Sequence, residues 1–266
     1  TVINTRPPAV AGAFYPGSAA TLAATVDGLL AAAAVQPATQ PKALIVPHAG
    51  YIYSGSTAAM AYATLAPWRS TIRRVVLLGP THRVAVNGLA VPESEAFATP
   101  LGAVPLDLNA IASLAGLPQI VFSDHAHAIE HSLEVHLPFL QRTLDHFSLV
   151  PLAVGHASPR EVAEVLDRLW GGTETLIVIS SDLSHFLPYA AATHVDRDTC
   201  DHILQLDTNI RPEQACGAYP VNGLLLAARQ RGLVPKLIHR CTSGDTAGDK
   251  QRVVGYASFT FHEPDA

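Results

Sequence analysis

Short apolar runs recur along the chain and suit the strands of a buried sheet. Each run is rich in β-branched residues and leucine, and each is bounded by turn residues such as glycine, proline or serine. We therefore expect strands at residues 43–47, 74–79, 148–155, 175–180 and 253–261.

Helix-like segments lie between these runs. Residues 18–34 are rich in alanine and leucine. The sequence SPRE at 158–161 combines a serine cap, a proline at the first helical position and a glutamate three residues after the cap, which predicts a helix start with a capping box. A third helix is expected over NGLLLAARQR at 222–231, ended by Gly232.

The alternation of strands and helices predicts an α/β fold. We expect one domain over residues 1–266, with a central, mostly parallel sheet that carries helices on both faces. The segment 92–107 is interrupted by prolines and is interpreted as a hairpin or an excursion within this domain.

Polar side chains follow four of the expected strands. His48 follows the first strand, His82 the second, His156 the third, and Asp182 and His185 the fourth. Ligands of open α/β sheets bind outside the carboxyl ends of the strands. A lone histidine at a strand end is more often structural, but four such ends together predict a site at this edge.

The residue types at these strand ends favour a metal site. Neutral imidazole is the commonest metal ligand, and two histidines with one anionic ligand leave open positions for other molecules. The candidates for the anionic ligand are Asp182, Glu130, Glu134 and the thiolate of Cys216. Cys216 lies in EQACGAYPVNG, between two helix-like stretches.

The sequence PHAGYIYSG after the first strand is interpreted as a turn. Gly50 and Gly55 would permit a close backbone approach or a positive φ. Tyr51 and Tyr53 could wall a pocket for a substrate, and simple packing under a loop explains them equally well.

Residues 127–131 match H-x-x-E-H, a pattern of zinc peptidases. On one helix, His127 and His131 would face the same side and could bind zinc, with Glu130 as the general base. This alternative leaves the polar strand ends unexplained. We expect instead a helix packed on the core, with His131 and Glu134 lining or supporting the cleft. The apolar stripe of this helix consists of Leu133, Leu137, Leu140 and Leu144.

Composition excludes several classes of function. The 266-residue chain is 48% hydrophobic and 15% charged, and its net charge of −5 gives no basic surface for nucleic acid. No run approaches the roughly 18 apolar residues of a membrane span. Three widely spaced cysteines, Cys200, Cys216 and Cys241, argue against a disulfide framework and favour the cytoplasm. No G-x-S-x-G, Walker A or G-x-G-x-x-G motif is present, so serine hydrolysis and nucleotide binding have no support.

Several motifs together resemble one family. RPPAVAGAFYPGS, IVPHAGYIYSG, LLGPTH, EHSLEVHLPFLQ, SSDLSHF, CGAYPV and GDTAGDKQRVVGYAS occur in the order found in the Memo family, over residues 6 to about 260. Bacterial members are called AmmeMemoRadiSam system protein B. The resemblance implies a fold similar to class III extradiol ring-cleaving dioxygenases.

The resemblance also implies a metal site. Carried over by motif, the ligands are His48, His82 and Cys216, with Asp182 and His185 close to the metal. Iron or copper is implied as the metal, and zinc is compatible with the protein as purified. The ring-cleaving dioxygenases use a carboxylate where this chain has a thiolate, and a thiolate changes metal preference.

We therefore expect a metal-dependent, dioxygenase-like redox enzyme in which His185, oriented by Asp182, acts as acid or base. Its cleft would take a small molecule, such as a phenol, or a peptide, with Tyr51, Tyr53, His131, Glu134 and His156 as contacts. The family name implies a link to a radical-SAM protein. The alternatives are a peptide- or partner-binding protein with a vestigial metal site and the H-x-x-E-H zinc peptidase.

Overall fold

A sheet of nine strands runs through the part of the chain that the computed structural model describes, which is residues 3–33, 35 and 38–265. The order is β10-β12-β2-β9-β3-β8-β4-β7, and β11 pairs with β12. The strands are β2 (Pro41–Val46), β3 (Arg74–Pro80), β4 (Leu89–Val91), β7 (Ile120–Phe122), β8 (Ser148–Val154), β9 (Thr175–Ser180), β10 (His185–Leu187), β11 (Val234–Thr242) and β12 (Val253–His262).

The centre of this sheet is parallel. Strands β2, β9, β3 and β8 are parallel neighbours, whereas β12 and β4 join them antiparallel. Every residue of β2 and β9 is buried, as expected for strands that are covered on both faces. The prediction of a mostly parallel central sheet is confirmed.

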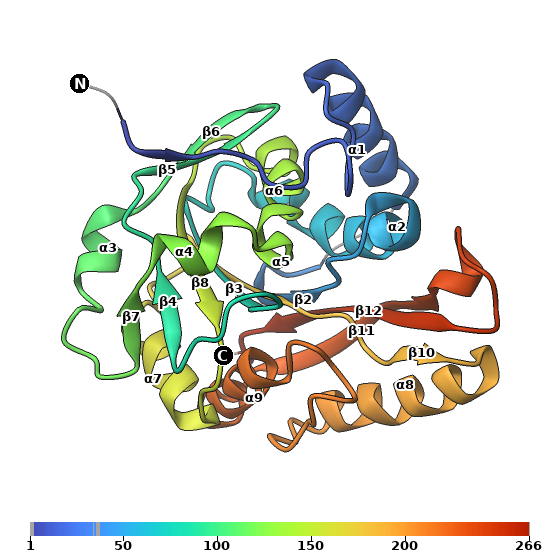
Figure 1. Cartoon of the computed structure of the whole chain (residues 1–266). Helices are drawn as coiled ribbons and strands as arrows, with labels where there is room; N and C mark the ends of the chain where they lie inside the picture. The colour runs from blue at the N-terminus through green and yellow to red at the C-terminus, as the bar shows by residue number, and fades with distance from the viewer. Residues whose placement is uncertain (1–2, 34, 36–37, 266) are drawn as a thin grey trace.

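Helices cover both faces of the sheet, which confirms the predicted layering. Figure 1 shows α1, α2, α5 and α6 on one side and α7, α8 and α9 on the other. The helices are α1 (Ala19–Ala33), α2 (Tyr51–Tyr62), α3 (Leu108–Ala112), α4 (Asp124–Ala128), α5 (His131–Glu134), α6 (Leu137–Thr143), α7 (Pro159–Arg168), α8 (Tyr189–Leu204) and α9 (Ala218–Arg231), with 3₁₀ turns η1 (Ala63–Trp68) and η2 (Ser243–Asp245).

The local signals at the helix ends act as the sequence indicates. Ser158 and Glu161 form the capping box of α7, and Gly232 ends α9 in the left-handed conformation with φ of 69°. Ala34, the predicted end of the first helix, lies outside the described residues. The segment 92–107 contains the hairpin of β5 (Ala96–Thr99) and β6 (Gly102–Pro105), which pairs with β1 (Thr5–Arg6) in a small separate sheet.

The interpretation of PHAGYIYSG as a turn is wrong. Helix α2 begins at Tyr51, and Gly50 precedes it with φ of −53°, so a positive φ is not needed. The expectation of a close approach holds for Gly55, where an added Cβ would lie 3.1 Å from Cδ1 of Leu29 on α1. The alanine-rich sequence after Tyr53 has high helix propensity and continues the helix.

The expectation of one helix over the H-x-x-E-H segment is also wrong. Helix α4 ends at Ala128 and α5 begins at His131, because Glu130 is extended (φ −81°, ψ 127°) and its carboxylate caps α5 by accepting the Ser132 N–H. His127 and His131 therefore belong to different helices. The apolar stripe from Leu133 to Leu144 is buried, as predicted.

None of the described helices is long and apolar enough to cross a membrane.

Candidate metal centre

Three neighbouring parallel strands deliver polar side chains to one edge of the sheet. His48 lies two residues beyond β2, Asp182 lies two residues beyond β9, and His82 lies two residues beyond β3. Because β9 lies between β2 and β3, these strand ends converge. The ring centroids of His48 and His82 are 5.1 Å apart.

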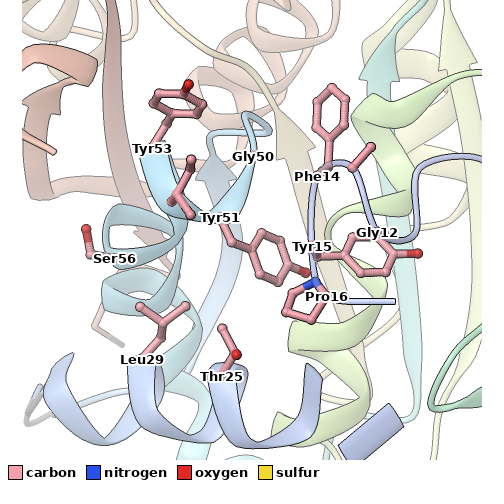
Figure 2. A pocket seen from close by; sticks show the side chains of 12 residues that line it. Gly12, Phe14, Tyr15, Pro16, Thr25, Leu29, Gly50, Tyr51, Tyr53 and Ser56 are labelled. Atoms are coloured by element: carbon pink, nitrogen blue, oxygen red, sulfur yellow. The ribbon is translucent and has the colours of Figure 1, made fainter. Parts of the chain in front are cut away.

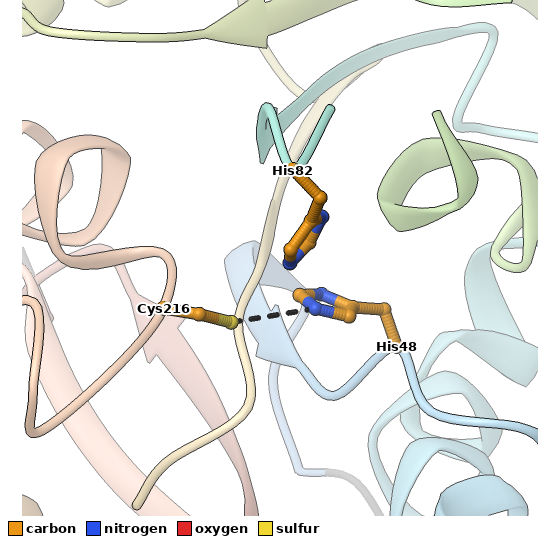
Figure 3. A group of neighbouring side chains, drawn as sticks. All are labelled: His48, His82 and Cys216. Atoms are coloured by element: carbon orange, nitrogen blue, oxygen red, sulfur yellow. Dashed lines mark hydrogen bonds between the residues drawn. The ribbon is translucent and has the colours of Figure 1, made fainter. Parts of the chain in front are cut away.

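Cys216 joins these two histidines from the loop before α9. One ring nitrogen of His48, one of His82 and the sulfur of Cys216 all lie within 4.8 Å of one another (Figure 3). The sulfur is 3.3 Å from Nε2 of His48. A tetrahedral metal with usual bond lengths separates a nitrogen and a sulfur ligand by about 3.5 Å. The donor set and its spacing therefore fit a metal ion.

The position of Cys216 depends on the glycine that follows it. The Gly217 N–H donates to Oγ of Ser181 at 2.9 Å. A Cβ on Gly217 would lie 2.5 Å from the carbonyl oxygen of Ser180, so any other residue would push this loop away from β9. This close packing explains why a glycine directly follows Cys216.

Burial, reinforced by the nearby Asp182 carboxylate, raises the pKa of the Cys216 thiol. A thiolate at this position therefore requires a compensating positive charge. A metal cation supplies that charge, and a coordinating thiol loses its proton.

Glu130 orients His82. Nδ1 of His82 donates to Oε2 of Glu130 at 2.8 Å, and the His82 backbone N–H donates to Oε1. Although burial opposes it, the hydrogen bond from His82 helps to lower the pKa of Glu130 to about 2. A carboxylate that holds Nδ1–H leaves Nε2 free for a metal, an arrangement common around metal-binding histidines.

His131 stacks beside this pair. Its ring lies 4.5 Å from the His82 ring and 4.6 Å from the Phe14 ring. Donor atoms of His82, Glu130 and His131 also lie within 4.8 Å of one another, so these three residues form a second possible set of metal ligands. Both oxygens of Glu130 already accept hydrogen bonds from His82, and Oε2 also accepts the Ser132 N–H, so Glu130 acts here as a support for His82.

Asp182 and His185 lie next to Cys216. Donor atoms of these three side chains fall within 4.8 Å of one another. Oδ1 of Asp182 accepts the backbone N–H of His48 at 2.8 Å, so the carboxylate also positions the loop after β2. Burial raises the pKa of Asp182 and lowers that of His185.

Two further predicted contact residues, Glu134 and His156, lie outside the donor group of His48, His82 and Cys216. Glu134 is buried and accepts hydrogen bonds from Arg6, Tyr15 and two backbone N–H groups of the N-terminal segment, so its carboxylate is fully engaged. His156 is exposed, and its ring packs 5.2 Å from that of Tyr219 on α9. His156 belongs to none of the donor groups found among the described residues.

The zinc peptidase geometry does not form. His127 is buried, and Nε2 of its ring contacts the carbonyl oxygen of Ala90 at 2.8 Å. Because His127 and His131 lie on separate helices, they do not share a donor group in the described part of the chain.

A cavity of about 590 Å³ lies between the N-terminal loop, α1 and α2 (Figure 2). It is lined by the N-terminal loop, by Thr25 and Leu29 of α1 and by the start of α2, where both Tyr51 and Tyr53 line it. The hydroxyl of Tyr51 donates to the carbonyl oxygen of Val135, so its ring faces the cavity while its polar end is engaged. Phe14 lies between the cavity and the histidines of the candidate site, because it lines the cavity and its ring packs on that of His131.

Sequence reasoning missed the side chains behind His48. Oγ of Ser180 contacts Nδ1 of His48 and Nε2 of His136, each at 2.7 Å. His136 lies in the same histidine-rich segment as His131, and this proximity in sequence is only a weak indication of a role at the site. Ser180 reads as an ordinary strand-end residue and gave no signal of its own.

Comparisons with known proteins show which family this chain resembles. A family model described as Memo-like protein matches residues 6–260. A MEMO1 family protein of Ignicoccus hospitalis is 35% identical over 97% of this chain and 99% of its own length. Another, of Aquifex aeolicus, is 35% identical over 97% of this chain and all of its own length.

A solved structure shares the fold. The structure of uncharacterized protein JW3007 from Escherichia coli K12 superposes with a TM-score of 0.51 at 15% identity, covering 84% of this chain and 99% of that one.

Proposed function

This chain belongs to the Memo-like family, and we propose that it is a metal-dependent redox enzyme that binds iron or copper through His48, His82 and Cys216. The observation that carries the proposal is the donor group itself. Two imidazole nitrogens and one sulfur, from three separate segments of the chain, lie within 4.8 Å of one another.

The chemistry of this donor set limits the metal. Imidazole suits zinc, copper and iron, and thiolate favours Cu(I), zinc and iron, whereas magnesium and calcium prefer oxygen ligands. When bound, iron or copper would supply one-electron chemistry and open positions for oxygen or an organic ligand.

The surrounding side chains have distinct roles in the proposal. His185 lies beside Cys216 and would exchange a proton with the substrate, while Asp182 holds the loop that carries His48. Among the predicted contacts, Tyr51 and Tyr53 would bound the substrate cavity with their rings. A small molecule with an aromatic group, such as a phenol, suits walls of this kind because aromatic faces pack well on one another.

Anaerobic purification followed by metal analysis and absorption spectroscopy tests the proposal. We expect iron or copper near one equivalent per chain, with a thiolate charge-transfer band that is absent in Cys216→Ser. His156→Ala is the matched control, because His156 is an exposed histidine outside the donor group, and it should retain metal and band.

Two results would oppose the proposal. A protein that binds no metal under any condition would be a partner-binding protein with a vestigial site. A protein that accepts only zinc would have no redox role. Oxygen uptake by the iron- or copper-loaded protein with a set of phenols then tests turnover.

A further inference from the structure

A chain of buried hydrogen bonds runs from Tyr62 to His48. The Tyr62 hydroxyl contacts Nδ1 of His136 at 2.8 Å, and Nε2 of His136 contacts Oγ of Ser180 at 2.7 Å. Oγ of Ser180 also contacts Nδ1 of His48 at 2.7 Å. The same oxygen lies 2.7 Å from the carbonyl oxygen of Ser132.

The carbonyl of Ser132 fixes the direction of every bond in this chain. A carbonyl oxygen can only accept, so the hydroxyl of Ser180 must donate its single hydrogen to it. Ser180 then has only lone pairs for its two histidine neighbours. Both His136 Nε2 and His48 Nδ1 must therefore be donors, and His136 Nδ1 accepts the hydrogen of Tyr62.

Burial prevents water from relaxing these constraints. Tyr62, Ser180, His136 and His48 are each exposed by 1% or less. A buried donor or acceptor without a partner costs about 1–3 kcal/mol, so an arrangement with reversed bonds is disfavoured. Burial also lowers the pKa of His136 to about 3, so His136 carries one ring hydrogen at neutral pH, in agreement with this bond pattern.

We propose that Ser180 is a positioning residue, supported by His136 and Tyr62, that holds His48 as the tautomer with hydrogen on Nδ1 and a bare Nε2. The bare nitrogen is the one that lies 3.3 Å from the sulfur of Cys216. His48 is thereby prepared for a metal before the metal arrives. The inference rests on the proposed function, since it assigns a purpose to the orientation of a proposed ligand.

The two histidines of the site are thus oriented by different chemistry. His82 donates to the charged carboxylate of Glu130, whereas His48 donates to the neutral hydroxyl of Ser180. A carboxylate raises the basicity of its imidazole more than a hydroxyl does. The neutral partner suits the fully buried histidine, because a carboxylate in the place of the Ser180 hydroxyl would add to the buried charge of Asp182 and carry a large desolvation cost.

Nitrogen-15 spectra of the histidine rings in the metal-free, full-length protein test the tautomer directly. Signals of His48 are identified by their loss in His48→Asn. We expect Nδ1 of His48 to carry the hydrogen and Nε2 to show the shift of a bare nitrogen. A hydrogen on Nε2 in the wild type would overturn the inference, and this result does not depend on whether any variant folds.

Ser180→Ala tests the cause. We expect the His48 signals to move toward a mixture of tautomers, and the affinity for Fe(II) or Cu(I) to fall by about 10–100-fold. Ser258→Ala is the matched control, because Ser258 is a fully buried serine on β12 whose hydroxyl finds no partner among the described residues, and it should change neither quantity. An unchanged His48 tautomer in a folded Ser180→Ala protein would overturn the role of Ser180.

The two proposals fail in different ways. A wild type with the expected His48 tautomer but no affinity for iron or copper would refute the proposed function and leave the hydrogen-bond assignment standing. A wild type that binds iron or copper with the opposite tautomer would refute only the inference about Ser180.

Discussion

The sulfur of Cys216 lies 3.3 Å from Nε2 of His48, although 168 positions separate the two residues in the chain. Strand β2 ends just before His48, and the loop before α9 brings Cys216 to the same edge of the sheet. A sulfur and a ring nitrogen at this separation, the nitrogen on a buried histidine and the sulfur on a half-buried cysteine, form one side of a metal site. The side chains around them determine whether the site can hold a metal firmly.

Glu130 should contribute to metal affinity without touching the metal. In Glu130→Gln the charged acceptor for Nδ1 of His82 is lost, so the ring is held less firmly and its basicity falls. We expect the affinity for Fe(II) or Cu(I) to fall by about 10–100-fold, measured by competition with a chromophoric chelator. Glu164→Gln, an exposed glutamate on α7, is the control and should leave the affinity unchanged. Equal affinities in all three proteins would remove Glu130 from the site.

Gly217→Ala should displace Cys216. The new Cβ would lie 2.5 Å from the carbonyl oxygen of Ser180, so the loop must move away from β9. We expect metal affinity to fall by about tenfold or more, which corresponds to ~1.4 kcal/mol, while the fold survives. Gly116→Ala is a suitable control because a Cβ there would meet no atom of the described part of the chain within 4 Å. Full affinity in Gly217→Ala would show that the close packing of this loop does not matter for the metal.

The central strands could be predicted from sequence because they are buried on both faces. Strands such as β9 therefore read as continuous apolar runs with clear ends. Helix α8 and strand β11 were not predicted. The middle of helix α8, from Thr193 to His202, is mostly polar, and most residues of β11 are exposed or half-buried, so neither shows a strong apolar pattern.

The site could be predicted only in part. His48 and His82 follow apolar strands directly, and the edge of a parallel sheet brings such residues together. Cys216 has no such local signal and was assigned through the family resemblance. The contributions of Ser180 and His136 depend on hydrogen bonds between distant segments, and a single sequence contains no information on such contacts. The hydrogen-bond partners of Glu134 likewise lie more than a hundred residues away in the sequence, so a single sequence cannot identify them.

The pH dependence of stability should contain a contribution from His127. Burial, opposed in part by the contact with the Ala90 carbonyl, lowers the pKa of His127 from 6.5 to about 4. Between these values the unfolded chain binds a proton that the folded chain does not, so stability falls as the pH falls from 6.5 to 4. This contribution is on the order of 3 kcal/mol.

Urea unfolding across this pH range measures the effect. In His127→Gln, whose amide can still donate to Ala90, we expect a shallower loss of stability below pH 6.5 than in the wild type. His146→Gln is the control, since His146 is exposed, and its profile should follow the wild type. Parallel profiles for His127→Gln and the wild type would contradict the assignment.

Arg6 should stabilise the segment that carries Glu130. Its guanidinium pairs with Glu134 at 2.9 Å and donates to the carbonyl oxygens of His127 and Glu130. Arg6→Met leaves the buried carboxylate without its cation, and the free energy of unfolding should fall by about 3–5 kcal/mol.

The stability lost in Arg6→Met is compared with the loss from breaking an exposed ion pair. Arg69 pairs with Asp145 on the surface, and Arg69→Met should cost at most about 1 kcal/mol. Both values come from urea unfolding at neutral pH. A loss in Arg6→Met as small as that in Arg69→Met would mean that the backbone N–H donors to Glu134 suffice to hold this segment.

Metal titration of four proteins tests most directly whether Cys216 is a metal ligand. These are the wild type, Cys216→Ser, Cys216→Asp and a double variant with Cys200→Ser and Cys241→Ser. The double variant is the control, because neither Cys200 nor Cys241 belongs to a donor group among the described residues. If Cys216 is a ligand, Cys216→Ser should lose more than the roughly 10–100-fold in iron or copper affinity that an outer contact costs. Cys216→Asp should shift preference from copper toward Fe(II), because a carboxylate is a harder ligand than a thiolate. The double control should bind like the wild type. Equal affinity in the wild type and Cys216→Ser would contradict the account and would make Asp182 or another carboxylate the third ligand.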